Sequence, residues 1–165
     1  MPATPLSPDQ ALRWLAHANR VAKRAMDMGR HPFGAVLVGP GGETLMAEQG
    51  NINTVNHAES TLARHAADNW PADHLAACTL VTTFEPCAMC AGTIYWAGIG
   101  GVLFGATETD LLALTGNHPE NPTLDVPCHL VFERGQRQVT LQGPVPQARD
   151  SLLALHQGFW ARRGA

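Results

Sequence analysis

Four residues of this chain have the types and spacing of a zinc site with an acid–base group beside it. They fall in two short motifs, His57-Ala58-Glu59 and Pro86-Cys87-Ala88-Met89-Cys90. One imidazole and two thiolates supply three zinc ligands, so the fourth tetrahedral position stays open for water, as in catalytic zinc sites. Zinc lowers the pKa of a bound water from about 15.7 to about 7. We therefore predict zinc held by His57, Cys87 and Cys90. Glu59, too close in the chain to His57 to be a fourth ligand, would carry protons.

Two other interpretations compete with a catalytic zinc site. A lone C-x-x-C is also found in redox pairs, and structural zinc sites normally use four protein ligands, often two C-x-x-C pairs. This chain has a single pair, and Cys78 and Cys128 stand alone. His65, two helical turns beyond His57, is expected to be a surface or packing residue. Because Pro86 fixes the backbone that leads into Cys87, it favours the catalytic interpretation.

Composition favours a single compact domain over residues 1–165. Hydrophobic residues make up 45% and charged residues 15% of the chain, as in ordinary soluble proteins. There is no apolar run of 18 residues and no signal-peptide pattern, so we expect a cytoplasmic protein without a membrane span. The formal net charge is -3 and the basic residues are scattered, which argues against nucleic acid as a partner.

Periodicity predicts helices that alternate with strands from the middle of the chain onward. Ser7 and Gln10 form a helix-start signal, and Gly29 is expected to end that helix. Both halves of the metal motif are predicted at helix N-termini, whose partial positive charge favours thiolates. Strands are predicted at 35–38, 44–47, 79–82, 102–104 and 138–141, with later helices at 57–69, 87–97 and 147–162. This order favours a mixed sheet covered by helices on both faces.

A family resemblance joins these motifs. It rests on five segments: Ala35-Val36-Leu37-Val38, Asn51, His57-Ala58-Glu59, Glu85-Pro86-Cys87-Ala88-Met89-Cys90-Ala91-Gly92 and Phe104-Gly105-Ala106. Together they resemble the cytidine deaminase-like superfamily, and within it the branch of guanine deaminases and bacterial tRNA adenosine deaminases. The resemblance runs from Leu12 to Arg162. It implies an α/β fold of three layers, α/β/α, with a five-stranded mixed sheet, one Zn²⁺ per subunit and a homodimer.

The resemblance also implies roles for single residues. His57, Cys87 and Cys90 match the zinc ligands, and Glu59 matches the general acid and base of the hydrolytic reaction. Asn51 matches a residue that hydrogen-bonds the substrate ring, although its loop also suits a plain turn residue. Two further substrate contacts are expected on the same basis. Phe33 matches a position that lines the base pocket, with ordinary core packing as the alternative, and Ala58 adjoins the acid–base residue.

The identity of the base depends on weaker signals. Ile94-Tyr95-Trp96-Ala97 and Glu108-Thr109-Asp110 resemble guanine deaminase, in which an aspartate recognises guanine. Asp110 would accept hydrogen bonds from a donor-rich edge, and Trp96 would be a pocket aromatic. The alternatives are a residue in the first turn of a helix for Asp110 and a core residue for Trp96. Gly116–Cys128 fits neither branch and is expected to form a loop near the pocket mouth.

The sequence thus predicts zinc-dependent hydrolytic deamination of a free nucleobase or related small aminoheterocycle, with guanine as the leading candidate. The expected partner is this small molecule, together with a second copy of the chain. One alternative is a tRNA adenosine deaminase, which the layout of the C-terminal part resembles. That end keeps only Arg162 and Arg163 as basic residues, which weakens the case for RNA. The other alternative is a non-catalytic zinc-stabilised module, which would leave Glu59 without a role.

Overall fold

The computed structural model describes residues 2–116 and 118–163, which form a layered α/β fold. Within these ranges five strands form one sheet in the order β2-β1-β3-β4-β5. The strands are β1 (Gly34–Val38), β2 (Leu45–Gly50), β3 (Thr79–Phe84), β4 (Gly101–Ala106) and β5 (Thr140–Gln142). β1 pairs antiparallel with β2 and β3, whereas β3–β4 and β4–β5 are parallel. The predicted five-stranded mixed sheet is confirmed.

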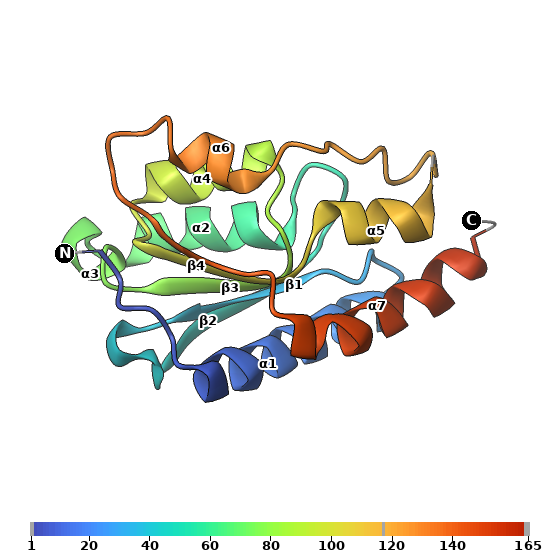
Figure 1. Ribbon diagram of the computed structural model, residues 1–165, viewed down its shortest axis with the longest axis horizontal. Coiled ribbons are helices and arrows are strands. Elements are labelled where there is room, and N and C mark those ends of the chain that lie inside the picture. Colours follow the sequence, from blue (N-terminus) through green and yellow to red (C-terminus); the bar gives the residue numbers. More distant parts are fainter. Residues whose placement is uncertain (1, 117, 164–165) are drawn as a thin grey trace.

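Helices cover both faces of the sheet (Figure 1). The two long helices α1 and α7 lie against one face, and α2, α4 and α6 form the layer on the other face. β1, β3 and β4 are buried along their whole length because they lie between these layers. The described helices are α1 (Pro8–Asp27), α2 (Ala58–Asn69), α3 (Ala72–Leu75), α4 (Ala88–Ala97), α5 (Glu108–Thr115), α6 (Cys128–Phe132) and α7 (Pro146–Ala161), with a 3-10 turn at Pro40–Gly42.

Local signals in the sequence account for several helix ends. Ser7 and Gln10 form the expected capping box at the start of α1, which ends at Asp27, with Gly29 at φ 78° just beyond it. Gly98 ends α4 in the left-handed region at φ 80°, which a residue with a Cβ rarely adopts. Of the short helices, α3 and α6 were not predicted, and α5 was expected only in the alternative that places Asp110 in the first turn of a helix. Four to eight residues are too few to show a helical hydrophobic period.

The fold brings the two metal motifs together at one end of the sheet. α2 and α4 pack side by side, and their N-termini begin directly after His57 and Cys87. The loop into α4 leaves the carboxyl end of β3, where loops that follow parallel strands gather. Both predicted helix-start positions are confirmed. No described helix is long and apolar enough to cross a membrane.

A buried histidine links α7 to this end of the sheet and makes stability depend on pH. His156 is fully buried between the rings of Phe33 and Phe84, and its Nδ1 accepts a hydrogen bond from the indole nitrogen of Trp160 at 3.1 Å. Burial lowers the pKa of His156 to about 3, whereas an unfolded histidine has a pKa of about 6.5. The unfolded chain therefore binds the extra proton between these values, and acid favours unfolding.

We expect His156 to lower the free energy of unfolding by about 2 kcal/mol between pH 7 and pH 5. His156→Gln keeps an acceptor for Trp160 but does not titrate, so its unfolding free energy should fall less over this range. Urea titrations at both pH values measure the difference, with exposed His65→Gln as the matched control. Equal pH dependence in wild type and His156→Gln would contradict the assignment.

Candidate active site

The three predicted zinc ligands converge in the structure. Their ligand atoms all lie within 4.8 Å of one another. The Nδ1 of His57 is 3.7 Å from the Sγ of Cys87 and 3.5 Å from the Sγ of Cys90. Ordinary zinc–nitrogen and zinc–sulfur bonds in a tetrahedron place such atoms about 3.5 Å apart. The donor set and spacing therefore fit one zinc ion with three protein ligands.

Neighbouring groups orient the His57 imidazole and shift the pKa values of the two cysteine thiols. The Nε2 of His57 lies 3.1 Å from the carbonyl oxygen of Thr54, to which it donates a hydrogen bond, so Nδ1 presents its lone pair to the site. The hydrogen bond from the Cys90 thiol is the largest cause that lowers the pKa of Cys87 to about 4. The pKa of Cys90 is raised by its hydrogen bond to Cys87 and by burial. Zinc needs both thiolates, so metal binding releases a proton.

Glu59 lies in the first turn of α2 beside the metal ligands. Its side chain is buried, and its Oε1 accepts a hydrogen bond of 2.9 Å from the hydroxyl of Thr82 on β3. Oε2 is 3.7 Å from the Sγ of Cys90. Burial raises the pKa of Glu59. A raised pKa means that the buried carboxyl holds a proton more readily than an exposed one, as a general acid requires.

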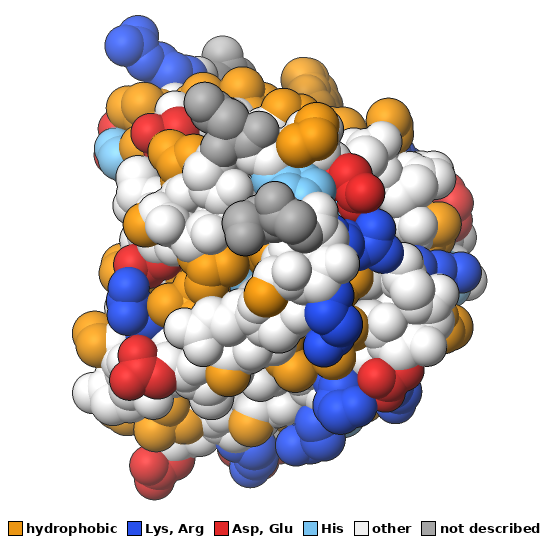
Figure 2. All heavy atoms as spheres, turned by 90° about the vertical axis from the view of Figure 1, so that its right-hand side faces the viewer, with side chains coloured by type: hydrophobic (Ala, Val, Ile, Leu, Met, Phe, Trp, Pro, Cys, Tyr) orange, Lys and Arg blue, Asp and Glu red, His pale blue; other side chains and the backbone are white. Residues whose placement is uncertain are grey.

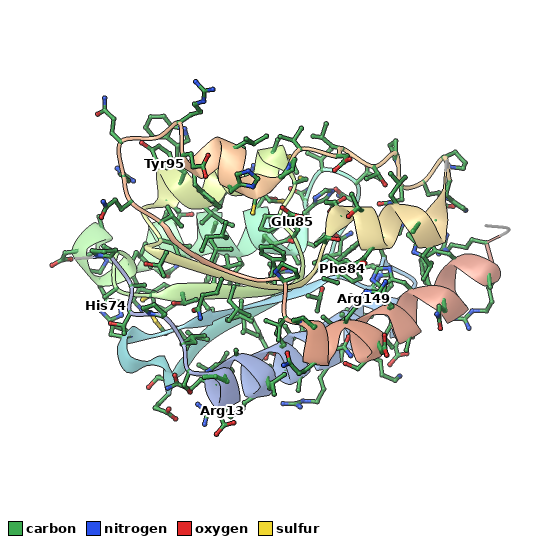
Figure 3. All side chains as sticks on the ribbon, in the orientation of Figure 1. Arg13, His74, Phe84, Glu85, Tyr95 and Arg149 are labelled. Atoms are coloured by element: carbon green, nitrogen blue, oxygen red, sulfur yellow. The ribbon has the colours of Figure 1, made fainter. Side chains whose placement is uncertain are left out.

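A cavity of about 480 Å³ opens over these groups, a size suited to a small ligand. Two of its wall residues, Phe84 and Glu85, lie where β3 ends, next to α5 (Figure 3). The lining residues are His31, Phe33, Asn51, Thr54, His57, Glu59, Phe84, Glu85, Cys87, Met89, Glu108, Pro119, Glu120, Asn121, Pro122, Thr123 and Leu124. The described lining includes four glutamates and no lysine or arginine. The cavity is therefore acidic.

Two of the predicted substrate contacts reach this cavity. Asn51 is buried, and its backbone N–H donates to the carbonyl oxygen of Phe33 at 3.0 Å, so the two residues are held together in the wall. Phe33 also packs against both hydrophobic cores, so its lining and packing roles coexist. Ala58 is different. It is fully buried in the core between α2 and the sheet and is not among the described lining residues.

The structure does not bring Asp110 or Trp96 to the cavity. Asp110 closes a capping box with Thr107 at the start of α5, and one of its oxygens lies 2.9 Å from the Arg149 guanidinium on α7. Trp96 is 77% exposed on α4, so it is neither a pocket aromatic of its own subunit nor a core residue. The residue of α5 that does line the cavity is Glu108. The Thr107-x-x-Asp110 pattern, readable in the sequence, could have shown this, because it fixes Asp110 as a cap.

Glu85 has a structural role that the sequence analysis missed. Its Oε1 accepts the backbone N–H of Cys128 at 3.0 Å, and its Oε2 accepts that of Glu108 at 3.4 Å. One carboxylate thereby ties the starts of α5 and α6 to the loop that carries Cys87. This positions the walls of the cavity around the metal ligands.

The segment 119–124 lies at the cavity, as predicted for the 116–128 loop. Its anchor is Glu120, which pairs with the guanidinium of Arg163 at 2.9 Å and with the Nε2 of His31 at 3.3 Å. Arg163 also stacks over Phe159, 4.4 Å from the ring centroid. The end of α7 therefore fixes this loop. Nothing in the local sequence pairs Glu120 with Arg163, because 43 positions separate them.

Comparison with known proteins gives a consistent set of relatives. A family model described as the cytidine and deoxycytidylate deaminase zinc-binding region matches residues 8–106. A Schizosaccharomyces pombe protein named "Probable cytosine deaminase" is 33% identical over 97% of this chain and 98% of its own length. The guanine deaminase of Bacillus subtilis is 45% identical, over 48% of this chain and 53% of its own length. The tRNA-specific adenosine deaminase of Haemophilus influenzae is 35% identical over 78% of this chain and 80% of its own.

Solved structures share the fold. A guanine deaminase from Nitrosomonas europaea superposes with a TM-score of 0.64 at 23% identity, covering 98% of this chain and 88% of that one. A mutant of NE0047 in complex with 8-azaguanine has a TM-score of 0.68 at 26% identity, with 92% of this chain and 85% of that chain covered.

Proposed function

Because this chain belongs to the cytidine and deoxycytidylate deaminase family, whose matched region is zinc-binding, we propose that it hydrolytically deaminates a free nucleobase, with guanine as the leading candidate. The observation that carries the proposal is Glu59, a buried carboxyl at the floor of a ligand-sized cavity and next to three zinc ligands. A zinc-stabilised module without activity would have no use for this carboxyl in an open cavity.

The chemistry divides between the metal and the chain. Zinc, when bound by His57, Cys87 and Cys90, supplies a Lewis acid that makes water a nucleophile near neutral pH. Thr82 holds Oε1 of Glu59, so Oε2 is the oxygen that takes up the proton. Glu59 gives this proton, taken from the attacking water, to the ring nitrogen. It then takes up the second proton from the hydroxyl added to the ring carbon and passes it to the leaving amine, which departs as ammonia. One carboxyl can serve both sites when both lie within hydrogen-bond reach.

The side chains that line the cavity favour a substrate without a phosphate group. Four glutamates and no described lysine or arginine line the cavity, so the described wall offers a phosphate group no lysine or arginine side chain to pair with. Arg163, one of the two basic residues that the C-terminal end keeps, is paired with Glu120. On the face around the end of α7, lysine and arginine side chains gather at one side with acidic side chains among them (Figure 2). The absence of lysine and arginine from the described cavity wall and the pairing of Arg163 favour a free base over a nucleotide or a tRNA.

Among free bases, two observations point in different directions. The guanine deaminase of Bacillus subtilis has the higher identity of the two base deaminases, 45%, over 48% of this chain, and solved structures of the same fold include a guanine deaminase and a complex with 8-azaguanine. The Schizosaccharomyces pombe relative, which matches over nearly the full length, makes cytosine the second candidate. A homodimer and a cytoplasmic location remain predictions, and sedimentation of the purified protein measures the first.

Ammonia release by the zinc-loaded protein tests the proposal. The substrates are guanine, cytosine, adenine, guanosine, cytidine and a tRNA anticodon stem-loop, with Glu59→Gln as the control. We expect turnover of a free base, guanine first, and turnover at least about a hundredfold slower by Glu59→Gln. Turnover of the stem-loop alone would replace the proposal with RNA editing. Silence on every substrate with zinc bound would refute deamination of these bases.

A further inference from the structure

One carboxyl group in the cavity wall has no role in the chemistry or the architecture described so far. Of the four glutamates in the wall, Glu59 carries protons, Glu85 binds two backbone N–H groups and Glu120 pairs with His31 and Arg163. Glu108 is the fourth. Among the described residues, its backbone N–H bonds to Glu85, but no hydrogen bond or ion pair engages its carboxyl.

The place of Glu108 in α5, and not a contact of its own carboxyl, sets the direction of its side chain. It is the first residue of α5, directly after the capping residue Thr107. Residues two apart on a helix point about 200° away from each other. Asp110 turns toward Arg149 on α7, and Glu108 therefore turns toward the cavity. The capping box and the ion pair of Asp110 hold this orientation.

The surroundings of Glu108 favour a ligand that donates hydrogen bonds. Burial, followed by the negative charges of Glu59, Cys87 and Glu85, raises the pKa of Glu108 to about 8. Near neutral pH this carboxyl therefore holds a proton when no ligand is bound, and N–H groups that a ligand supplies stabilise its ionised, acceptor-only form. A ligand without such groups leaves the carboxyl unpaired, which costs binding energy.

We propose that Glu108 is a specificity-determining residue that accepts a hydrogen bond from an N–H group of the substrate heterocycle. The inference rests on the proposed function and narrows its substrate class to uncharged heterocycles that are rich in N–H groups. Nucleobases and aminotriazines belong to this class. Heterocycles whose contacted nitrogen is alkylated, and substrates that bring a phosphate to this wall, do not.

Binding and turnover by matched variants test this assignment. The zinc-loaded wild type is compared with Glu108→Ala, with Glu108→Gln, which keeps one acceptor oxygen, and with Glu133→Ala, an exposed carboxylate outside this cavity. Calorimetry measures Kd for 8-azaguanine, guanine and cytosine, and ammonia release gives kcat and KM. We expect Glu108→Ala to raise Kd and KM about tenfold to a hundredfold with a smaller change in kcat. Glu108→Gln should recover part of the loss, and Glu133→Ala should match wild type.

N-methylated guanines identify which nitrogen Glu108 contacts, because the losses of binding caused by the methyl group and by Glu108→Ala should not add. A methyl group on the nitrogen that Glu108 binds should raise Kd for wild type. In Glu108→Ala the same methyl group should change Kd little, because the hydrogen bond is already lost. Wild-type Kd and KM in Glu108→Ala would overturn the inference and leave the proposed function intact. Glu108-dependent binding without ammonia release would overturn the proposed function and leave the inference intact. If wild type neither binds nor deaminates any free heterocycle, both fail.

Discussion

Glu59→Gln is expected to lower kcat by at least a hundredfold to ten-thousandfold, the usual contribution of a positioned acid–base group (about 10²–10⁴). Glutamine has the same shape and can still accept the hydrogen bond from Thr82, so the fold and the cavity should persist. What it loses is the capacity to take up and return a proton at Oε2. Because the loss concerns proton transfer and not binding, KM should change much less than kcat.

Zinc content separates this expectation from a simple loss of metal. Glu59 is not among the three residues whose ligand atoms converge, so Glu59→Gln should bind as much zinc as wild type by elemental analysis. A matched control is Glu85→Gln, a second glutamate of the same wall, which should act mainly on stability because it bonds backbone groups of Cys128 and Glu108. A Glu59→Gln protein with wild-type kcat and bound zinc would show that another group carries the protons.

Cys90→Ala is expected to lose both zinc and activity. Cys90 is fully buried at the second position after the start of α4, where no other described thiol or imidazole can replace it. Metal binding contributes to the stability of the folded state by linkage, because the unfolded chain does not hold the three ligands together. The variant should therefore contain little zinc and unfold at a lower temperature than the zinc-loaded wild type.

Measuring Tm before and after zinc removal by a chelator compares this variant with wild type. Removal of zinc should lower the Tm of wild type and leave the Tm of Cys90→Ala unchanged, since the variant has no metal to lose. Cys78→Ala serves as the matched control. Cys78 is equally buried, and its thiol lies against Met46 and the carbonyl oxygen of His74, away from the metal site. Full zinc occupancy in Cys90→Ala would show that the ligand assignment is wrong.

Glu108 and Asp110 are close in the chain, and the sequence did not reveal which of their carboxyl groups faces the cavity. Both carboxylates stand in one short segment after β4, and the sequence analysis chose Asp110 as the substrate contact. The capping box with Thr107 and the ion pair with Arg149 turn Asp110 away from the cavity. The capping box is local, so the sequence alone could have revealed it. The ion pair joins residues 39 positions apart and follows only from the packing of α7 near α5. Figure 3 labels Arg149, which belongs to α7 and lies near α5.

The sequence by itself determined the three zinc-ligating residues, the carboxyl that lies beside them and the layered α/β architecture. These were readable because each depends on local chemistry: a C-x-x-C at a helix start, a histidine and a glutamate two residues apart, and apolar periods long enough to separate strands from helices. Tertiary structure alone decided which side chains close the cavity. Glu120 meets His31 and Arg163, and His156 enters between Phe33 and Phe84, through contacts between segments that are distant in the chain. Such contacts depend on the angles at which helices cross the sheet, and no short-range pattern records those angles.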